Sequence, residues 1–446
     1  CIMIEGAANE IPDSEFVKAL HFAQGHVATI VTAIEELAAK VGKPKRDYTV
    51  TVAKEDLLEI AYEVAGDRIE DAIYAPNKVE RGKKVGALRD EVEATLKERV
   101  PNVSEFEIEQ CFEYIQKKAF RIAIMEKGVR ADGRDIDTLR ELYAEAGTLP
   151  RVHGSSIFAR GETQALATAT LAPADERQYF DNYAGGEDSK RFILHYSFPP
   201  FSVGEAGRFG GLNRREIGHG ALAERSIEPV IPAEADFPYA MRVTSEVLES
   251  NGSSSMATVC SGVMALLDAG VPLIRPVGAI AVGLVTEMDE NDNIKEYKTL
   301  LDIIGSEDFY GDMDFKICGT SEGITGYQLD LKLAGVPLAI LEEAVVKAAG
   351  GREKVLQKMH DTIAVPAALS EHAPRIESTK IDPERIGELI GPGGKNIKGI
   401  QAESGADINI EDDGTVHVYA AKKESLDRAM EMIKQMFAEV EVGTVY

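Results

Sequence analysis

The sequence predicts an α/β protein, with an all-helical domain before the α/β core and a small second α/β unit after it. Three observations predict this arrangement. Apolar residues recur at three- and four-residue steps in the first quarter of the chain. Period-two apolar stretches then alternate with helical stretches from about residue 128 onward. The length of 446 residues exceeds what one hydrophobic core organises, which favours several domains.

The composition is ordinary for a globular protein, with 44% hydrophobic and 28% charged residues. The formal net charge of −26 argues against a protein that coats nucleic acid through bulk electrostatics, although a local arginine cluster can still grip RNA. No apolar run is long enough to cross a membrane, and the first residues lack the basic region of a signal peptide. We therefore expect no membrane partner.

The four cysteines are Cys1, Cys111, Cys260 and Cys318, which are far apart and form no CxxC pair. This spacing excludes a disulfide framework and a zinc site. It favours the reducing environment of the cytoplasm.

The first domain, expected at 12–127, is helical throughout. Its first helix follows Asp13 or Ser14 as a cap and ends at Gly42-Lys43-Pro44. The apolar positions of that helix are Phe16, Val17, Leu20, Val27, Ile30, Val31, Ile34, Leu37 and Val41. Further helices are expected at 54–74, 84–99 and 104–127.

The central α/β core is expected at 128–367. Its strands include 191–198, 239–247 and 325–333, and its helices 215–228, 255–269 and 337–360. A linker at 368–374 then leads to a unit at 375–438, which reads strand, helix, glycine-rich loop, helix, two strands and helix. Residues 439–446 look like the first strand of another domain, and residues 1–11 like the end of a preceding one.

The glycine-rich loop of the last unit contains Gly391, Gly393 and Gly394, followed by Lys395. Without a Cβ the backbone can approach an anion closely, and the lysine adds positive charge at a helix N-terminus. A plain helix–helix turn also uses glycines. Here the βααββα order around the loop matches the KH module, whose GxxG loop clamps single-stranded RNA, so RNA binding is predicted.

Two further segments suggest an anion site. Ser253, Ser254 and Ser255 precede an apolar helix, where hydroxyl and amide groups can hold an anion, although capping alone commonly places serine there. Arg214 and Arg215 open another helix, where their charge opposes the helix dipole, and this favours an anionic ligand nearby. His219, one turn later, would by itself be read as structural.

The segment from Glu307 to Lys316 suggests a metal site. If the chain is extended from Met313 onward, Asp312, Asp314 and Lys316 share one face, and Asp308 could approach that face across the turn. Two carboxylates beside a lysine suit a hard divalent cation in phosphate chemistry. An acidic turn before a strand is the alternative. The run 289–293 lacks a basic partner and is interpreted as a solvated hairpin tip.

Taken together, these segments resemble the polynucleotide phosphorylases of bacteria. The matching stretches in the core are Asp132–Arg134, Arg160–Gln164, His195–Glu205, Arg214–Gly220, Glu249–Met256 and Gly311–Lys316. The resemblance implies that the core is the second RNase PH-type core of that family, an α+β fold like domain 2 of ribosomal protein S5. It also implies that 1–11 ends the first core, 12–127 is the linker domain, 375–438 is the KH domain, and 439–446 enters an OB-fold domain.

The resemblance implies a phosphate-dependent 3′-to-5′ exoribonuclease of single-stranded RNA, active in mRNA turnover, that releases nucleoside diphosphates and can run in reverse to extend RNA. Ser253, Ser254, Ser255, Arg214 and Arg215 would hold phosphate. Asp308 and Asp314 would bind Mg²⁺, or Mn²⁺ in its place. Lys316 would offset transition-state charge, His219 would lie near the scissile end, and Arg134 would contact RNA.

The family assembles as a homotrimer ring and can join other RNA-decay proteins. Two alternatives remain. A non-catalytic RNase PH-like scaffold subunit would be expected to lose the acidic pair or the arginines, which are present here. A hydrolytic nuclease would need a richer acidic cluster with two metals.

Overall fold

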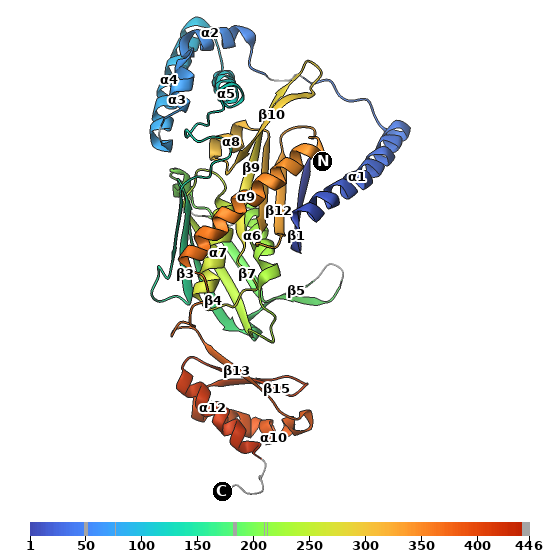
Figure 1. The fold of residues 1–446 in the computed structure, drawn as a ribbon, viewed down its shortest axis with the longest axis vertical. Helices are drawn as coiled ribbons and strands as arrows, with labels where there is room; N and C mark the ends of the chain where they lie inside the picture. The colour runs from blue at the N-terminus through green and yellow to red at the C-terminus, as the bar shows by residue number, and fades with distance from the viewer. Residues whose placement is uncertain (49–51, 76, 182–184, 209, 212, 439–446) are drawn as a thin grey trace.

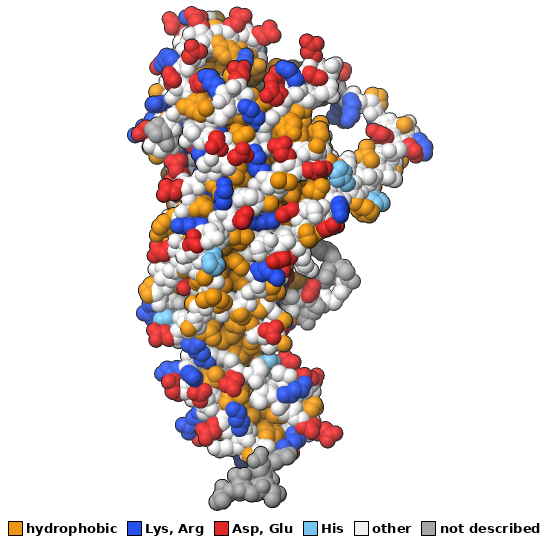
Figure 2. Space-filling model, viewed as in Figure 1, with side chains coloured by type: hydrophobic (Ala, Val, Ile, Leu, Met, Phe, Trp, Pro, Cys, Tyr) orange, Lys and Arg blue, Asp and Glu red, His pale blue; other side chains and the backbone are white. Residues whose placement is uncertain are grey.

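The computed structural model describes residues 1–48, 52–75, 77–181, 185–208, 210–211 and 213–438. A helical domain lies at one end of the long axis, an α/β core in the middle, and a small α/β domain at the other end (Figure 1). Positive and negative side chains are interspersed over the face drawn in Figure 2, in keeping with the modest role of bulk electrostatics expected from the net charge.

The core contains two five-stranded sheets. The first has the order β1-β12-β11-β9-β10 and is antiparallel throughout. Its strands are β1 (Met3–Ile11), β9 (Gly278–Met288), β10 (Ile294–Leu301), β11 (Met313–Gly319) and β12 (Ile324–Leu331). The second has the order β2-β3-β4-β8-β7, in which only β7 and β8 are parallel. Its strands are β2 (Leu142–Ala146), β3 (Gly154–Arg160), β4 (Thr163–Pro173), β7 (Phe192–Ser197) and β8 (Tyr239–Glu249). A separate hairpin pairs β5 (Gln178–Asp181) with β6 (Glu187–Lys190).

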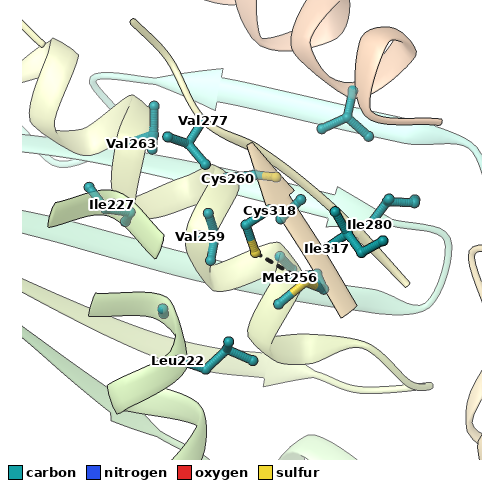
Figure 3. Close-up of a cluster of buried hydrophobic side chains, with 14 of the residues drawn as sticks. Leu222, Ile227, Met256, Val259, Cys260, Val263, Val277, Ile280, Ile317 and Cys318 are labelled. Atoms are coloured by element: carbon teal, nitrogen blue, oxygen red, sulfur yellow. Dashed lines mark hydrogen bonds between the residues drawn. The ribbon is translucent and has the colours of Figure 1, made fainter. Parts of the chain in front are cut away.

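Helix α7 (Ser254–Asp268) is the centre of the core, because all but one of its fifteen residues are buried. It packs against β3 and β4 of one sheet and β9 of the other. Figure 3 shows Met256, Cys260 and Val263 of this helix among Ile280 and Ile317 of the first sheet. A helix that is mostly apolar and buried on every side is stable only when it is enclosed, as it is here by sheets on both sides.

Two more helices complete the core. Helix α6 (Arg214–Ile227) packs against β7, α7 and β12, and α9 (Leu338–Thr362) covers the first sheet. The predicted helices 215–228, 255–269 and 337–360 and the three predicted strands are confirmed within a few residues. Residues 289–293 form the turn of the β9–β10 hairpin, as predicted.

The helical domain consists of α2 (Glu55–Ala65), α3 (Arg68–Ile73), α4 (Lys78–Arg99) and α5 (Glu105–Ile122). Asn77 caps α4, and Ser104 with Glu107 forms a capping box at the start of α5. Its core includes Leu57, Val92, Ile115 and Phe120, and it continues into Ala281, Val285 and Leu300 of the first sheet. The domain is therefore fixed to the outer side of that sheet.

The first 41 residues differ from the single helical domain expected at 12–127. Strand β1 pairs with β12 at the edge of the first sheet, and α1 (Asp13–Val41) begins beside α9, apart from the other four helices. Phe16 and Leu20 are the buried residues of α1, and they belong to the core of the α/β domain. The apolar pattern alone could not indicate which body this helix joins, because it only defines a face.

The C-terminal domain has the predicted element order. Strands β13 (Arg375–Lys380), β14 (Asp407–Ile410) and β15 (Thr415–Ala420) form one antiparallel sheet. Helices α10 (Ile386–Ile390), α11 (Lys395–Ser404) and α12 (Lys423–Met436) pack on it around their own hydrophobic core. The strand expected at 439–446 lies outside the described residues.

All four cysteines are free thiols, and Cys111, Cys260 and Cys318 are buried. Cys318 Sγ lies 3.6 Å from Met256 Sδ inside the core (Figure 3). Within the described ranges, no helix combines the length and the apolar character needed to span a bilayer.

We predict that Gly154→Ala destabilises the core, whereas Gly350→Ala does not. A Cβ at Gly154 would lie far inside van der Waals contact with the backbone of Ala265 and Ala269 at the end of α7, whereas one at Gly350 in α9 meets nothing within 4 Å. Overpacking of this kind costs about 1–3 kcal/mol, and Ala in an exposed helix gains up to about 1 kcal/mol over Gly. Thermal unfolding of both variants checks this; equal midpoints would contradict the packing described here.

Candidate phosphate and RNA site

The serine loop at 250–255 joins β8 to α7. Ser253 has a left-handed backbone conformation, with φ at 57°, directly before the first turn of the helix. The Ser254 and Tyr196 hydroxyls share a hydrogen bond of 2.8 Å. Ser255 Oγ is buried and has no hydrogen-bond partner among the described residues. A long helix whose first turn is lined by hydroxyls, one of them unpartnered, is suited to bind an anion.

The arginine pair opens α6 on the same side of the core. Asn213 and Glu216 form a capping box that fixes the start of this helix. Arg215 stacks on Phe198, with its guanidinium carbon 3.9 Å from the ring centroid, and Arg214 beside it is exposed. A stacked guanidinium is held in place without a carboxylate, so its positive charge stays available to an anion.

The acidic residues come from α8 (Gly305–Tyr310) and β11. Asp314 forms an ion pair with Lys316, and its other oxygen, Oδ1, is buried without a partner among the described residues. Desolvation and the negative charge of Asp314 raise the pKa of Asp308 above its ordinary value. Burial opposes the charge of Lys316, but the negative charges of Asp314, Asp308 and Asp330 together outweigh it and raise the pKa of this lysine.

His219 lies between the serine loop and the acidic residues. Its Nδ1 lies 3.5 Å from Tyr196 Oη, which in turn contacts Ser254. Desolvation and the positive charges of Lys316 and Arg215 lower the pKa of His219 to about 4, so its imidazole is neutral at pH 7. The same two charges also act on Asp308. Ser254, Arg215, His219, Asp308, Asp314 and Lys316 therefore form one cluster, drawn from both sheets.

Two expected participants lie elsewhere. Asp312 precedes β11 and turns away, because Arg121 of α5 donates to both of its carboxylate oxygens at 2.8 Å. Arg134 was expected to contact RNA, but its guanidinium donates to Asp132, to the Thr138 carbonyl and to the Asp302 carbonyl, at 2.7 to 3.0 Å. The observed contacts of Arg134 are therefore structural.

The pair of Asp308 and Asp314 fits a divalent cation in its donor chemistry. The unpartnered buried oxygen of Asp314 is the observation that favours this, since a buried carboxylate oxygen ordinarily has a partner. Over the part of the chain that the structure describes, no group of three or more His, Cys, Asp or Glu is arranged to hold a metal. Mg²⁺ is commonly bound by two protein carboxylates, with water and phosphate oxygens as its other ligands.

Sequence reasoning missed two residues of this cluster. Tyr196 is the bridge between Ser254 and His219, and burial raises its pKa to about 12. Lys332, directly after β12, donates to the carbonyl groups of Asp308 and Phe309. Tyr196 lies in the matching stretch 195–205 and could have been found there, whereas no local pattern marks Lys332.

The KH loop lies in the C-terminal domain between α10 and α11. Gly391, Gly393 and Gly394 all have positive φ, from 64° to 78°, which favours glycine. Asn396 Nδ2 donates to the Glu388 carbonyl at 2.8 Å and holds the loop closed against α10. Lys395 begins α11, as expected.

Comparisons with known proteins agree with this domain order. Residues 138–272 match the 3′ exoribonuclease family, domain 1; residues 376–435 match the KH domain; and residues 56–135 match the RNA binding domain of polyribonucleotide nucleotidyltransferase. The class defined by fold and site is thus an RNase PH-type core joined to a helical domain and a KH domain.

The whole chain aligns with polyribonucleotide nucleotidyltransferases. It is 68% identical to the one from Akkermansia muciniphila, 53% to the one from Methylacidiphilum infernorum and 45% to the one from Opitutus terrae, in each case over 100% of this chain. The chain spans 62–63% of the length of these relatives. The chain is therefore similar over its whole length to a part of these relatives, in agreement with the resemblance that the sequence motifs predicted.

We predict that the His219 imidazole, in protein free of divalent cations, titrates near pH 4. NMR of His-labelled protein measures this, with His219→Gln to assign the resonance. The unfolded chain binds this proton near pH 6.5, so the folded state loses stability as the pH falls from about 6.5 to 4, and His219→Gln removes that part of the loss. A midpoint near 6.5 would contradict the enclosed, positively charged surroundings of this side chain.

We predict that Gly393→Asp weakens binding of single-stranded RNA while Gly393→Asn has a smaller effect. A side chain at Gly393 meets nothing within 4 Å, and both residues tolerate a positive φ, so the two variants differ mainly in charge. One added negative charge near a phosphate costs about 1 kcal/mol, roughly fivefold in Kd. Equal affinities of the two variants in a salt-controlled titration would rule out phosphate contact at this loop.

Proposed function

We propose that this chain carries the catalytic site of a phosphate-dependent 3′-to-5′ exoribonuclease that shortens single-stranded RNA and releases nucleoside diphosphates. One observation supports this above the others. The serine loop, suited to an anion, is connected through Tyr196 and His219 to Asp314, whose negative charge in turn acts on Asp308. The names of the relatives, polyribonucleotide nucleotidyltransferases, agree with this activity.

In the proposed reaction an oxygen of inorganic phosphate attacks the phosphorus of the last phosphodiester of the RNA. A new P–O bond forms, the bond from phosphorus to the preceding 3′-oxygen breaks, and that oxygen takes up a proton. The products are a nucleoside 5′-diphosphate and an RNA one nucleotide shorter. Since phosphoanhydride and phosphodiester bonds are exchanged without water, the same site can extend RNA from diphosphates.

Residues of this chain mainly have to hold two anions together and neutralise the charge of the transition state. Ser253, Ser254 and Ser255 would hold the attacking phosphate, with Arg214 and Arg215 next to it. Lys316 would offset charge that develops on the transferred group. His219 is neutral, so it can approach the scissile end as a hydrogen-bonding group without forming an ion pair.

Asp308 and Asp314 would hold Mg²⁺, or Mn²⁺ in its place. When bound, such a cation polarises phosphoryl oxygens and stabilises negative charge on the leaving oxygen. Burial and the nearby negative charge of Asp314 raise the pKa of Asp308, and a bound cation would relieve the repulsion between the two carboxylates.

The other domains supply the proposed partners. The KH domain would bind the RNA upstream of the site through Gly391, Gly393, Gly394 and Lys395. Free cysteines agree with a cytoplasmic protein. We further propose that the helical domain comprises 55–127, apart from the strand and helix at 3–41, and that it is followed by domains or linkers at 128–367, 368–374, 375–438 and 439–446. We also propose a homotrimer ring and contacts with other RNA-decay proteins.

The exposed side of α1 supports a larger assembly. Phe22, Ile30, Ile34, Leu37 and Val41 are all more than half exposed along this helix. An apolar row of this size on a protruding helix is ordinarily covered in the working protein.

We predict that Asp314→Asn abolishes metal-dependent release of nucleotides, because it removes one of the two carboxylates that would hold the cation. A loss of at least about a hundredfold is expected. Asp292→Asn, on the β9–β10 turn, is the matched control, since Asp292 is exposed with a φ of 60° that Asn also adopts.

The assay incubates the full-length protein with single-stranded RNA and Mg²⁺, with and without inorganic phosphate, and identifies the released nucleotide. Diphosphates released only with phosphate would support phosphorolysis. Monophosphates released without phosphate would establish hydrolysis instead. RNA bound but not shortened would favour the scaffold alternative.

A further inference from the structure

The serine loop is held from behind by side chains that the proposed reaction does not use. Arg140 precedes β2, Arg160 ends β3 and Thr163 begins β4, so all three come from one end of the second sheet. Arg160 and Thr163 are completely buried, and Arg140 is almost fully buried. Buried cationic and hydroxyl groups need partners, and here they find them in the loop backbone.

Three consecutive carbonyl oxygens of the loop accept hydrogen bonds from these side chains. The carbonyl of Asn251 accepts from Arg140 Nη1 at 3.1 Å, that of Gly252 from Thr163 Oγ1 at 2.9 Å, and that of Ser253 from Arg160 Nη2 at 3.0 Å. The Asn251 carbonyl also accepts from the Gly305 N–H at 3.0 Å, and the Ser253 carbonyl from the Met256 and Ala257 N–H groups of α7 at 3.1 and 3.3 Å. All three carbonyls are thus held by donors behind the loop.

This fixes the direction of the amide groups. In a planar trans peptide the C=O and N–H bonds point in opposite directions. With the carbonyls of 251, 252 and 253 bound from behind, the N–H groups of Gly252, Ser253 and Ser254 are directed away from these donors. None of these three N–H groups has a hydrogen-bond acceptor among the described residues. Successive free amides beside a left-handed residue form a concave site for an anion.

Arg140, Thr163 and Arg160, which hold the three carbonyls, are called the clamp below. One carboxylate fixes its two arginines. Asp302 accepts from Arg140 Nη2 at 2.7 Å and from Arg160 Nη1 at 3.2 Å. Two guanidinium groups share this single carboxylate, which leaves excess positive charge behind the loop. That charge favours an anion on the other side.

Lys78 of the helical domain adds a fourth contact. Its Nζ donates to the Ser250 carbonyl at 2.8 Å, and its backbone N–H donates to Glu162 Oε1 at 2.9 Å. The other oxygen of Glu162 accepts from Asn251 Nδ2 at 2.9 Å. Both contacts end on the serine loop, so the first turn of α4 supports it directly.

We infer that Arg140, Thr163 and Arg160, with Lys78 from the helical domain, are positioning residues that aim the backbone amides of the serine loop at inorganic phosphate. None of them touches the phosphate; they act through the loop carbonyls. The inference rests on the proposed function, since it concerns the phosphate that the reaction consumes. It also gives the helical domain a role in phosphate affinity, apart from any contact with RNA.

Thr163 offers the sharpest test, because Val keeps its shape and removes the hydroxyl, while Ser keeps the hydroxyl. Thr163→Val leaves the Gly252 carbonyl and the Asn251 amide without their partner. In the full-length protein we expect the Kd for inorganic phosphate, measured by calorimetry, and the KM for phosphate to rise at least about fivefold. The KM for RNA should be unchanged, and Thr163→Ser should restore the wild-type values.

Lys78→Met provides a variant that leaves the buried network intact, with Lys83→Met, exposed on the same helix, as the matched control. We expect Lys78→Met to raise the Kd and KM for phosphate about two- to fivefold, with an unchanged melting temperature. Lys83→Met should match the wild type.

The outcomes separate this inference from the proposed function. A wild-type protein that binds no phosphate and releases monophosphates would overturn the proposed function. Suppose instead that the wild type releases diphosphates and that Thr163→Val folds but binds phosphate with unchanged affinity. This result would overturn only the inference that the clamp positions the serine loop. If Thr163→Val does not fold, unchanged phosphate affinity in Lys78→Met overturns it equally.

Discussion

The buried carboxylate of Asp302 is the interaction that joins the two sheets at the site. It follows β10 of the first sheet and accepts from two arginines of the second, Arg140 and Arg160. Burial alone would raise its pKa, but these two positive charges outweigh burial and lower the pKa below the ordinary range of an aspartate. The group therefore stays ionised. Removing it would leave two buried guanidiniums without compensation, which costs about 3–5 kcal/mol for a broken buried pair.

The proposed site depends on that junction because neither sheet carries it alone. The serine loop extends from β8 of the second sheet, whereas Asp314 and Lys316 lie on β11 of the first. Helix α6 packs on β7 of the second sheet and β12 of the first, so it places Arg215 and His219 between the two sheets' contributions to the site. A shift of one sheet against the other would separate the proposed phosphate and metal positions, which is why a buried ion pair sits beneath them.

The helical domain holds the acidic side of the site in the same way. Arg121 of α5 binds Asp312, two residues before Asp314, with both carboxylate oxygens at 2.8 Å. Arg130, just after the domain, donates to Glu307 Oε1 at 2.7 Å, next to Asp308. Together with Lys78 at the serine loop, these contacts connect one helical domain to both halves of the site.

Local patterns in the sequence were sufficient to predict most helices and strands of the core and the kinds of residue that form the proposed site. Apolar spacing predicted α6, α7 and α9 within a few residues, because a helix needs one apolar stripe and a strand needs alternation, and both are visible in a short window. The stretches at 214–220, 249–256 and 311–316 indicated the anion and metal chemistry.

Tertiary structure alone decided which residues meet. Asp312 shares the predicted alternation with Asp314, yet Arg121, 191 residues earlier, draws it away. Helix α1 shows the period of the other helices but joins a different core. Contacts between residues so far apart leave no period or spacing in the sequence, because they depend on how packed surfaces fit, and that is settled only when the sheets and helices come together.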